Sequence, residues 1–179
     1  MSHEPLNSFD LWVDDIAQGD IQRILLSLGR VIRFLDEKLH SAGEVHPSLV
    51  PETLLVNDGN DVDLDYLEKS EVKREAGFLY YRAPELTDDT PTTAQGEVYA
   101  IAAIAFRSFA GHPPTRGKRR FWSWQADLML NIPGQPELSK AILGALSTDP
   151  MKRPQDLRAL HSTLFQAFQP LAVNQRPKM

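Results

Sequence analysis

The chain contains no cysteine among its 179 residues, which excludes disulfides, thiolate metal sites and cysteine catalysis. A cysteine-free chain fits a reducing compartment, so we expect a cytoplasmic location. No apolar run approaches the roughly 20 residues that a membrane-spanning helix needs. The first ten residues lack the basic and then apolar order of a signal peptide, and no segment repeats. The length is that of a single globular domain with a substantial core.

Positive charge is scarce in the first part of the chain. Residues 1–75 carry sixteen acidic and seven basic side chains, a net charge of −9, whereas residues 76–179 carry eight and twelve, a net charge of +4. The sum is the overall net charge of −5. An acidic chain repels phosphate backbones, so we expect neither nonspecific nucleic-acid binding nor a membrane partner.

Apolar periodicity predicts a mainly α domain with one small β hairpin. Residues 21–40 show a strong helical stripe, and residues 98–110 are apolar on all sides, as in a buried central helix. Asn57-Asp58-Gly59-Asn60 predicts a hairpin turn between two short strands, because Asn and Gly tolerate positive φ. We expect a flexible tail at 1–8, one domain at 9–169 and a disordered tail at 170–179. Further helices are expected at 9–17, 121–130, 137–146 and 155–168.

The most informative segment is 46–56, which reads HPSLVPETLLV. It resembles the catalytic loop and following strand of eukaryotic-type protein kinases, usually H-R-D-L-K-P-E-N-L-L-V. Five more segments resemble that family in the same order: residues 39–46, Gly77 with 81–85 (YRAPE), 97–101 (EVYAI), 111–114 (GHPP) and 146–154 (LSTDPMKRP). The resemblance implies the helical C-terminal lobe of a kinase. No Gly-rich loop or strand lysine precedes it in the sequence, so we expect the N-terminal lobe to be lacking.

The chemical residues of the resembled loop are replaced. Ser48 stands at the position of the catalytic aspartate, Val50 at that of the phosphate-facing lysine and Thr53 at that of the metal-binding asparagine. Serine is not anionic at neutral pH and cannot replace aspartate as a proton acceptor. Phe78 replaces the activation-segment threonine, and Pro47 replaces the arginine that receives a phosphate. These changes predict a pseudokinase that is not an enzyme and does not bind ATP.

Two further sets of residues have structural interpretations. The resemblance implies that His46 packs structurally and that Glu85 and Arg153 form a buried ion pair. The metal-ligand position falls on Asp65 or Tyr66, depending on the alignment. The aspartates at 58, 61, 63 and 65 do not match a calcium loop, and their alternation with Val62 and Leu64 indicates the wet face of a hairpin strand. We therefore expect no metal and no cofactor.

Two surfaces are candidates for binding. The first is an apolar patch of Leu11, Trp12 and Leu55, which an upper kinase lobe would cover and through which we expect binding or homodimerisation. The second is a basic stretch beside aromatic residues, which is a solvated loop, a phosphate or nucleic-acid grip, or a protein docking surface. Its candidate residues are Arg116, Lys118, Arg119, Arg120 and Trp122.

The leading functional hypothesis is a catalytically inactive pseudokinase module that acts as a protein-interaction or regulatory scaffold. The alternative is a half-kinase that gains nucleotide binding only when a partner chain supplies the missing lobe. Charge in the cleft distinguishes them, because triphosphate–magnesium binding needs cations and carboxylates there. A residual or repurposed transferase or hydrolase is a third, weaker interpretation.

Overall fold

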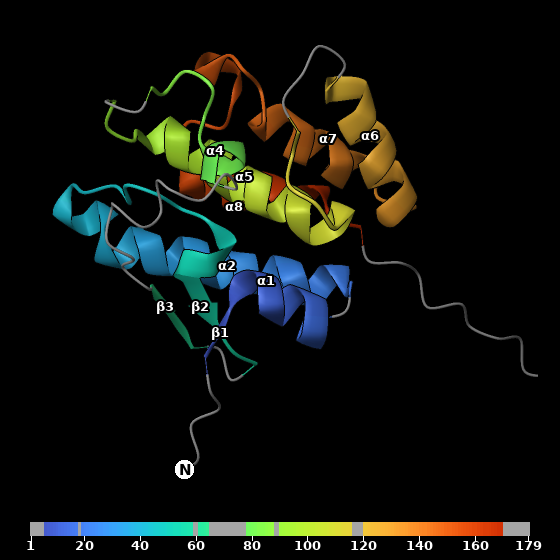
Figure 1. Cartoon of the computed structure of the whole chain (residues 1–179), viewed down its shortest axis with the longest axis horizontal. Coiled ribbons are helices and arrows are strands. Elements are labelled where there is room, and N and C mark those ends of the chain that lie inside the picture. The colour runs from blue at the N-terminus through green and yellow to red at the C-terminus, as the bar shows by residue number, and fades with distance from the viewer. Residues whose placement is uncertain are drawn as a thin grey trace, which may run out of the picture.

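A buried helix, α5 (Ala94–Ala110), forms the centre of the molecule. The computed structural model describes residues 6–17, 19–58, 61–64, 78–87, 90–115 and 120–169, and in this part α5 packs against α2, α4, α6, α7 and α8 (Figure 1). The Thr93 hydroxyl caps its first turn by accepting from the Gly96 amide at 3.0 Å. Gly111, at φ 80°, ends it in the left-handed conformation that glycine adopts without strain. The all-apolar sequence correctly predicted a central helix.

The helix α2 (Ile21–Lys38) lies across the centre and packs against α5 and α8. Asp20 caps it by accepting from the Arg23 amide at 3.0 Å. Its apolar stripe is buried and its other face carries charged residues, as the periodicity predicted.

Helices α6 (Arg120–Asn131), α7 (Pro136–Ala145) and α8 (Leu157–Ala167) form the C-terminal part of the molecule. The Asp156 carboxylate caps α8 by accepting from the Ala159 amide at 2.8 Å. A single turn, α4 (Phe78–Tyr81), packs against α5. Short 3-10 turns occupy His40–Ala42, Pro51–Thr53 and Pro150–Lys152.

The sheet has three antiparallel strands in the order β1–β2–β3. β2 (Leu54–Val56) and β3 (Val62–Leu64) are the predicted hairpin, with Leu54 opposite Leu64. The third strand, β1 (Asn7–Ser8), pairs with β2 and corrects the prediction of a flexible tail at 1–8. Backbone pairing with an otherwise open strand edge orders these two residues. The fold class, mainly α with a small antiparallel sheet, is confirmed. Residues 1–5 and 170–179 of the predicted tails lie outside the described residues.

The segment after β1 starts as an α-turn, α1 (Phe9–Leu11), and continues as a π-helix, Trp12–Ala17. Its apolar side faces the core, where Phe9 and Trp12 are buried with ring centroids 5.8 Å apart. Within the described residues, no helix combines the length and apolar character needed to cross a bilayer.

Candidate functional site

The loop that resembles a kinase catalytic loop is held by buried polar contacts. His46 is 3% exposed, and burial lowers the pKa of its imidazole from 6.5 to about 4. Its Nδ1 accepts from the Ser48 amide at 3.1 Å, so the ring is neutral and shapes the turn. Ser48, at the position of the catalytic aspartate, contributes its backbone amide to this turn.

The next turn of the loop closes on itself. The Thr53 hydroxyl is buried, donates to the Val50 carbonyl at 2.9 Å and lies 3.2 Å from the Val50 amide. The Val50 side chain is itself 5% exposed and belongs to the core. The side chains at the phosphate-facing and metal-binding positions of the resembled loop therefore serve packing and turn formation in this structure.

The position of the activation-segment threonine is also apolar and packed. Phe78 is 7% exposed at the start of α4, with the Arg82 guanidinium 5.7 Å from its ring centroid. Arg82 also donates to the carbonyls of Thr87 and Thr90. Both residues considered for the metal-ligand position, Asp65 and Tyr66, lie outside the described residues. Among the residues that the structure describes, no group of three or more His, Asp or Glu could hold a metal ion.

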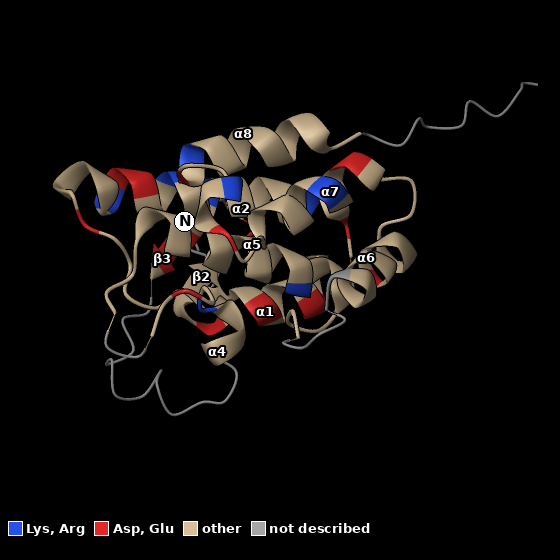
Figure 2. Cartoon of the chain, turned by 90° about the horizontal axis from the view of Figure 1, so that it is seen from above, with Lys and Arg blue, Asp and Glu red and all other residues tan. Residues whose placement is uncertain are grey.

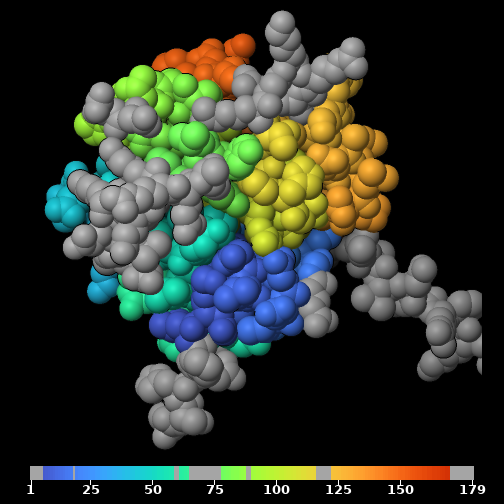
Figure 3. Space-filling view, in the orientation of Figure 1, coloured from blue at the N-terminus to red at the C-terminus, as the bar shows by residue number. Residues whose placement is uncertain are grey.

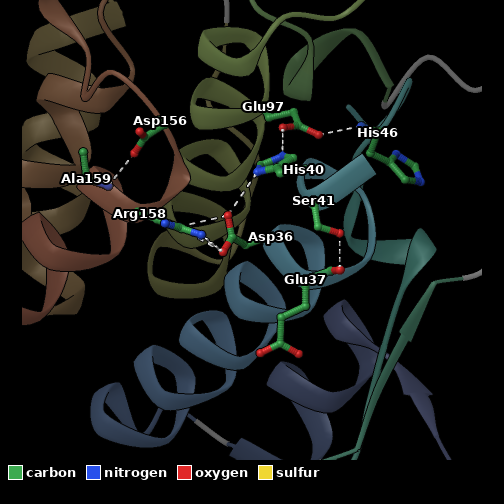
Figure 4. A network of polar contacts seen from close by, with 9 residues as sticks. All are labelled: Asp36, Glu37, His40, Ser41, His46, Glu97, Asp156, Arg158 and Ala159. Carbon is green, nitrogen blue, oxygen red and sulfur yellow. Dashed lines mark hydrogen bonds and ion pairs between the residues drawn. The ribbon is translucent and has the colours of Figure 1, made fainter. Parts of the chain in front are cut away.

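A fully buried carboxylate, Glu97 of α5, anchors the loop at His46 (Figure 4). One oxygen accepts from the His46 amide at 2.5 Å, and the other lies 2.7 Å from His40 Nε2. Burial raises the pKa of Glu97, and the bonds from His46 and His40 act in the opposite direction. The Glu97 carboxyl ties the loop to the central helix in either protonation state.

The same network continues to the surface. His40 Nδ1 lies 3.6 Å from the Asp36 carboxylate, which also accepts from Arg158 of α8 at 2.6 Å (Figure 4). The Arg158 hydrogen bond lowers the pKa of Asp36 despite opposing desolvation. Sequence analysis assigned no role to His40, Glu97 or Asp36. Two of the contacts join residues far apart in the chain: His40 and Glu97 are 57 residues apart, and Asp36 and Arg158 are 122 apart. The third, between His40 and Asp36, spans one helical turn. The position of Glu97 at the start of the all-apolar segment was the one available signal, since a charge there needs a buried partner.

The structure brings Glu85 and Arg153 together as a bidentate pair, with both N–O distances at 2.7 Å. The Arg153 side chain is fully buried, whereas 27% of the Glu85 side chain is exposed, so the pair is less buried than we predicted. Arg153 also donates to the carbonyls of Ser147 and Gln95 and stacks 5.0 Å from the Tyr99 ring centroid. Burial, the largest single effect, would raise the pKa of Glu85, but the hydrogen bonds from Arg153 and from a backbone amide, together with the Arg153 charge, lower it below its ordinary value.

The predicted apolar cleft patch is not formed as we expected. Leu11 is 54% exposed and Leu55 is half-buried, but Trp12 is 2% exposed. Its indole Nε1 donates to Asp58 at 3.2 Å, and the ring lies under the Arg23 guanidinium. Trp12 is therefore a core residue and not part of a binding surface, which removes the largest apolar group from the predicted patch.

The basic–aromatic stretch leads into a helix with an exposed apolar face. Arg116, Lys118 and Arg119 lie outside the described residues, and Arg120 begins the backbone of α6. The side chains of Trp122, Met129 and Leu130 are 75%, 62% and 79% exposed. With the exposed Ala126 they share one side of the helix, and we call these four residues the α6 face. Figure 3 shows α6, in golden orange, at the edge of the molecule.

Sequence reasoning found Trp122 but missed Met129 and Leu130. Buried residues of α6 and of the position that follows it are spaced four apart, at Trp124, Leu128 and Ile132. Those three positions already define the core side of the helix, so the spacing places Met129 and Leu130 away from that side. The spacing was the available signal.

The curated proteins that this chain resembles are protein kinases. The mitogen-activated protein kinase homolog NTF6 of Nicotiana tabacum is 27% identical over 99% of this chain and 48% of its own length. Probable serine/threonine-protein kinase 2 of Plasmodium falciparum is 27% identical over 64% of this chain and 22% of its own length. Serine/threonine-protein kinase PknE of Mycobacterium tuberculosis is 30% identical over 44% of this chain and 15% of its own length. The chain thus spans about half or less of each of these relatives. No protein-family model matches the chain.

Solved structures give the same fold. The PknI kinase domain of Mycobacterium tuberculosis superposes with a TM-score of 0.66 at 21% identity, covering 94% of this chain and 65% of that domain. A double mutant of that domain gives a TM-score of 0.68, covering 93% and 64%. At this identity the likeness establishes the fold.

These findings contradict one prediction from the sequence. We expected that the chain is not an enzyme, on the grounds of Ser48, Val50 and Thr53. The similar proteins are named as kinases, two of them as serine/threonine-protein kinases, which points toward an enzyme, although the chain spans only part of each. The substituted loop is therefore not a sufficient argument against catalysis.

The resemblance predicted from the motifs is confirmed. The segments that resemble kinase motifs pack as one helical unit. Nearly all of this chain superposes on part of a solved kinase domain. The chain has the protein-kinase fold over part of a kinase domain, the helical C-terminal lobe.

Proposed function

We propose that this lobe binds a protein partner through the α6 face and acts as a regulatory or scaffolding part of a kinase-like protein. The observation that carries the proposal is the exposure of Trp122, Met129 and Leu130 on one side of a single helix. Large apolar side chains seldom gather on the surface of a monomer, and where they do, the patch usually marks an interaction site. Tryptophan and methionine are also enriched at protein interfaces.

The α6 face is not needed to hold the helix in place. Trp124, Leu128 and Ile132 attach α6 to the core, and all three are at most 3% exposed. Trp124 packs 5.9 Å from the Phe106 ring of α5. The helix is therefore a rigid support that presents the exposed side chains, an arrangement that reduces the entropy lost on binding.

A second candidate is phosphoryl transfer or nucleotide binding when another lobe completes the cleft. The names of the similar proteins favour it, because they are kinases. The loop side chains at Val50 and Thr53 supply no charge for a triphosphate, so cations would have to come from the other lobe. Titration calorimetry with ATP and magnesium tests it, on the chain alone and mixed with a separately expressed upper lobe of a similar kinase. Binding only in the mixture supports this candidate, and absence of binding in both removes it.

The partner proposal is tested by quantitative affinity capture followed by mass spectrometry. We expect proteins captured by the wild-type chain to be lost from the double variant Trp122→Ser with Met129→Ser. Leu26→Ser is the matched control, because Leu26 is an exposed apolar residue on a different helix, α2, with 42% exposure. Capture that is equal for all three proteins contradicts the proposal. Light scattering on the purified chain shows whether the partner is a second copy of it. The cytoplasmic location expected from the sequence stays a prediction.

A further inference from the structure

A groove runs between α6 and α7, beside the α6 face. It has a volume of about 500 Å³, within the size range of protein binding pockets. Figure 2 shows the two helices side by side at one end of the molecule, and they are in contact. Trp124 of α6, Leu143 of α7 and Leu146 just after α7 give the groove an apolar lining. These three side chains are core residues of the lobe, so the lining is rigid.

The rim of the groove is basic. Lys140 of α7 and Lys152 of the Pro150–Lys152 turn line it together with the polar residues Gln125, Ser147 and Thr148. Among the described residues, none that lines this groove is acidic. Lys140 pairs with Glu137 at 2.7 Å, but with side chains 71% and 51% exposed the pair is weak and exchanges readily. The Asp149 carboxylate, the nearest acid in sequence, caps the Met151 amide at 3.0 Å.

The middle of the groove is open because of a glycine. Gly144 lines both this groove and the adjoining hollow toward α8, which Lys140 and Lys152 also line. A Cβ placed at Gly144 would meet no atom within 4 Å. The space over α7 at this position is therefore open, and a Cβ at 144 would extend into it without meeting a neighbour.

We infer that this groove binds an acidic peptide segment of the partner, with one apolar anchor side chain over Gly144 and flanking carboxylates at Lys140 and Lys152. The inference deepens the proposed function and rests on it. The apolar lining selects a hydrophobic side chain, and the two ammonium groups come from different elements, which matches an anchor with acidic residues on both sides. The groove and the α6 face then lie on two sides of the same helix, so that one partner reaches both.

The probes are synthetic hexapeptides of aspartate and glutamate with one central leucine, isoleucine, phenylalanine or tryptophan. Fluorescence anisotropy measures their binding to the full chain. We expect at least one to bind below about 1 mM, and to weaken about tenfold or more when the acids become lysine or the anchor becomes serine. Higher salt weakens binding as well, because the ion pairs are exposed. Failure of every peptide to bind at about 1 mM overturns the inference.

Two groove variants and one control make the location testable. Gly144→Leu fills the space, and the pair Lys140→Glu with Lys152→Glu reverses the rim charge. Each is expected to weaken peptide binding about tenfold or more. Lys38→Glu reverses an exposed lysine on α2 and should leave binding unchanged. Circular dichroism checks that the variants fold, and Gly144→Leu is expected to be at least as stable as the wild type, because leucine favours helix over glycine. Wild-type binding by both groove variants overturns the inference.

The three tryptophans of the chain provide an independent readout. In protein labelled with 5-fluorotryptophan, ¹⁹F spectra contain one line each from Trp12 in the core, Trp122 on the α6 face and Trp124 in the groove. Single Trp→Phe variants assign them. Peptide binding in the groove shifts the Trp124 line and leaves the Trp12 line in place. A shift of Trp122 alone would locate the peptide on the α6 face, which contradicts the groove and leaves the proposed function standing. Loss of partner capture in Gly144→Leu but not in the α6-face variant supports the groove and contradicts the α6 face.

Discussion

The loop at 46–56 and the helix α6 use their side chains in opposite ways. The loop lies at the position that resembles the kinase catalytic loop, and His46, Val50 and Thr53 are buried and make hydrogen bonds within the loop. Helix α6 carries no residue predicted for chemistry, yet Trp122, Met129 and Leu130 project from it without cover. The loop buries its side chains in the lobe, whereas α6 leaves large apolar side chains exposed to solvent.

The comparison teaches that position in a fold does not decide what a side chain does. Val50 and Thr53 stand where the resembled kinase loop has its lysine and asparagine, yet both are buried like other core residues. We propose that binding takes place where apolar surface stays exposed, on the α6 face and in the groove between α6 and α7. Substitutions in the two regions should therefore separate stability from binding.

The largest stability effect is expected at Arg153, which holds the segment around Glu85 to the helical body. Arg153→Ala leaves Glu85 and the Ser147 and Gln95 carbonyls without their donor, so the free energy of unfolding should fall by about 3 kcal/mol or more. Urea denaturation measures it. The control is Arg158→Ala, which breaks a solvent-exposed pair with Asp36 and should change stability little. Equal effects from the two variants would show that the Arg153 pair is not special.

The next effect concerns pH. The folded state lowers the pKa of His46 from 6.5 to about 4, so its contribution is fully present above pH 6.5 and is lost as pH falls toward 4. This corresponds to about 3 kcal/mol over that interval. His46→Gln keeps an acceptor for the Ser48 amide but cannot titrate. The unfolding free energy of the variant should therefore fall less steeply between pH 7 and 4 than that of the wild type. Glu97 titrates in both proteins, and its opposite contribution cancels in the difference. Parallel pH profiles would refute the role of His46.

A smaller effect is expected at Thr53. Thr53→Val removes the hydroxyl that pairs with the buried Val50 amide and carbonyl, at a cost of about 1–3 kcal/mol in unfolding free energy. Thr53→Ser keeps the hydroxyl and serves as the matched control, so it should lose less. Chemical denaturation of the three proteins side by side provides the test. A Val variant as stable as the wild type would show that the turn does not depend on this hydroxyl.

The smallest stability effect is expected on the α6 face. Trp122→Ser removes a side chain that is 75% exposed, so the unfolding free energy should change by no more than about 0.5 kcal/mol. The same urea experiment measures it. A loss comparable to that of Arg153→Ala would mean that Trp122 supports the fold, and the contrast between the two regions would disappear.

The sequence predicted the helices best where apolar periodicity was strong, as in α2 and α5. It missed β1 because a two-residue strand has no pattern of its own and forms by pairing with β2. The Trp12 error has a different cause. The apolar spacing of 9, 12, 13 and 16 already indicated a buried side, but the kinase analogy led us to expect Trp12 on an exposed cleft. The local pattern was the better guide.

The candidate site was predictable only in part. Glu85 and Arg153 were located through family motifs, because the motif fixes both partners of a contact 68 residues apart. The network of Glu97, His40 and Asp36 was not predictable, since it depends on how α2, α5 and α8 pack. The groove over Gly144 also required the structure, because a helical glycine in a sequence does not reveal whether the space above it is empty.

Hydrogen–deuterium exchange on the chain with and without its captured partner tests the central claim most directly. The account predicts that the partner slows exchange of amides in α6 and leaves residues 46–56 unchanged. Slower exchange at 46–56 with no change in α6 would contradict the account and place the binding surface at the loop that resembles a catalytic site.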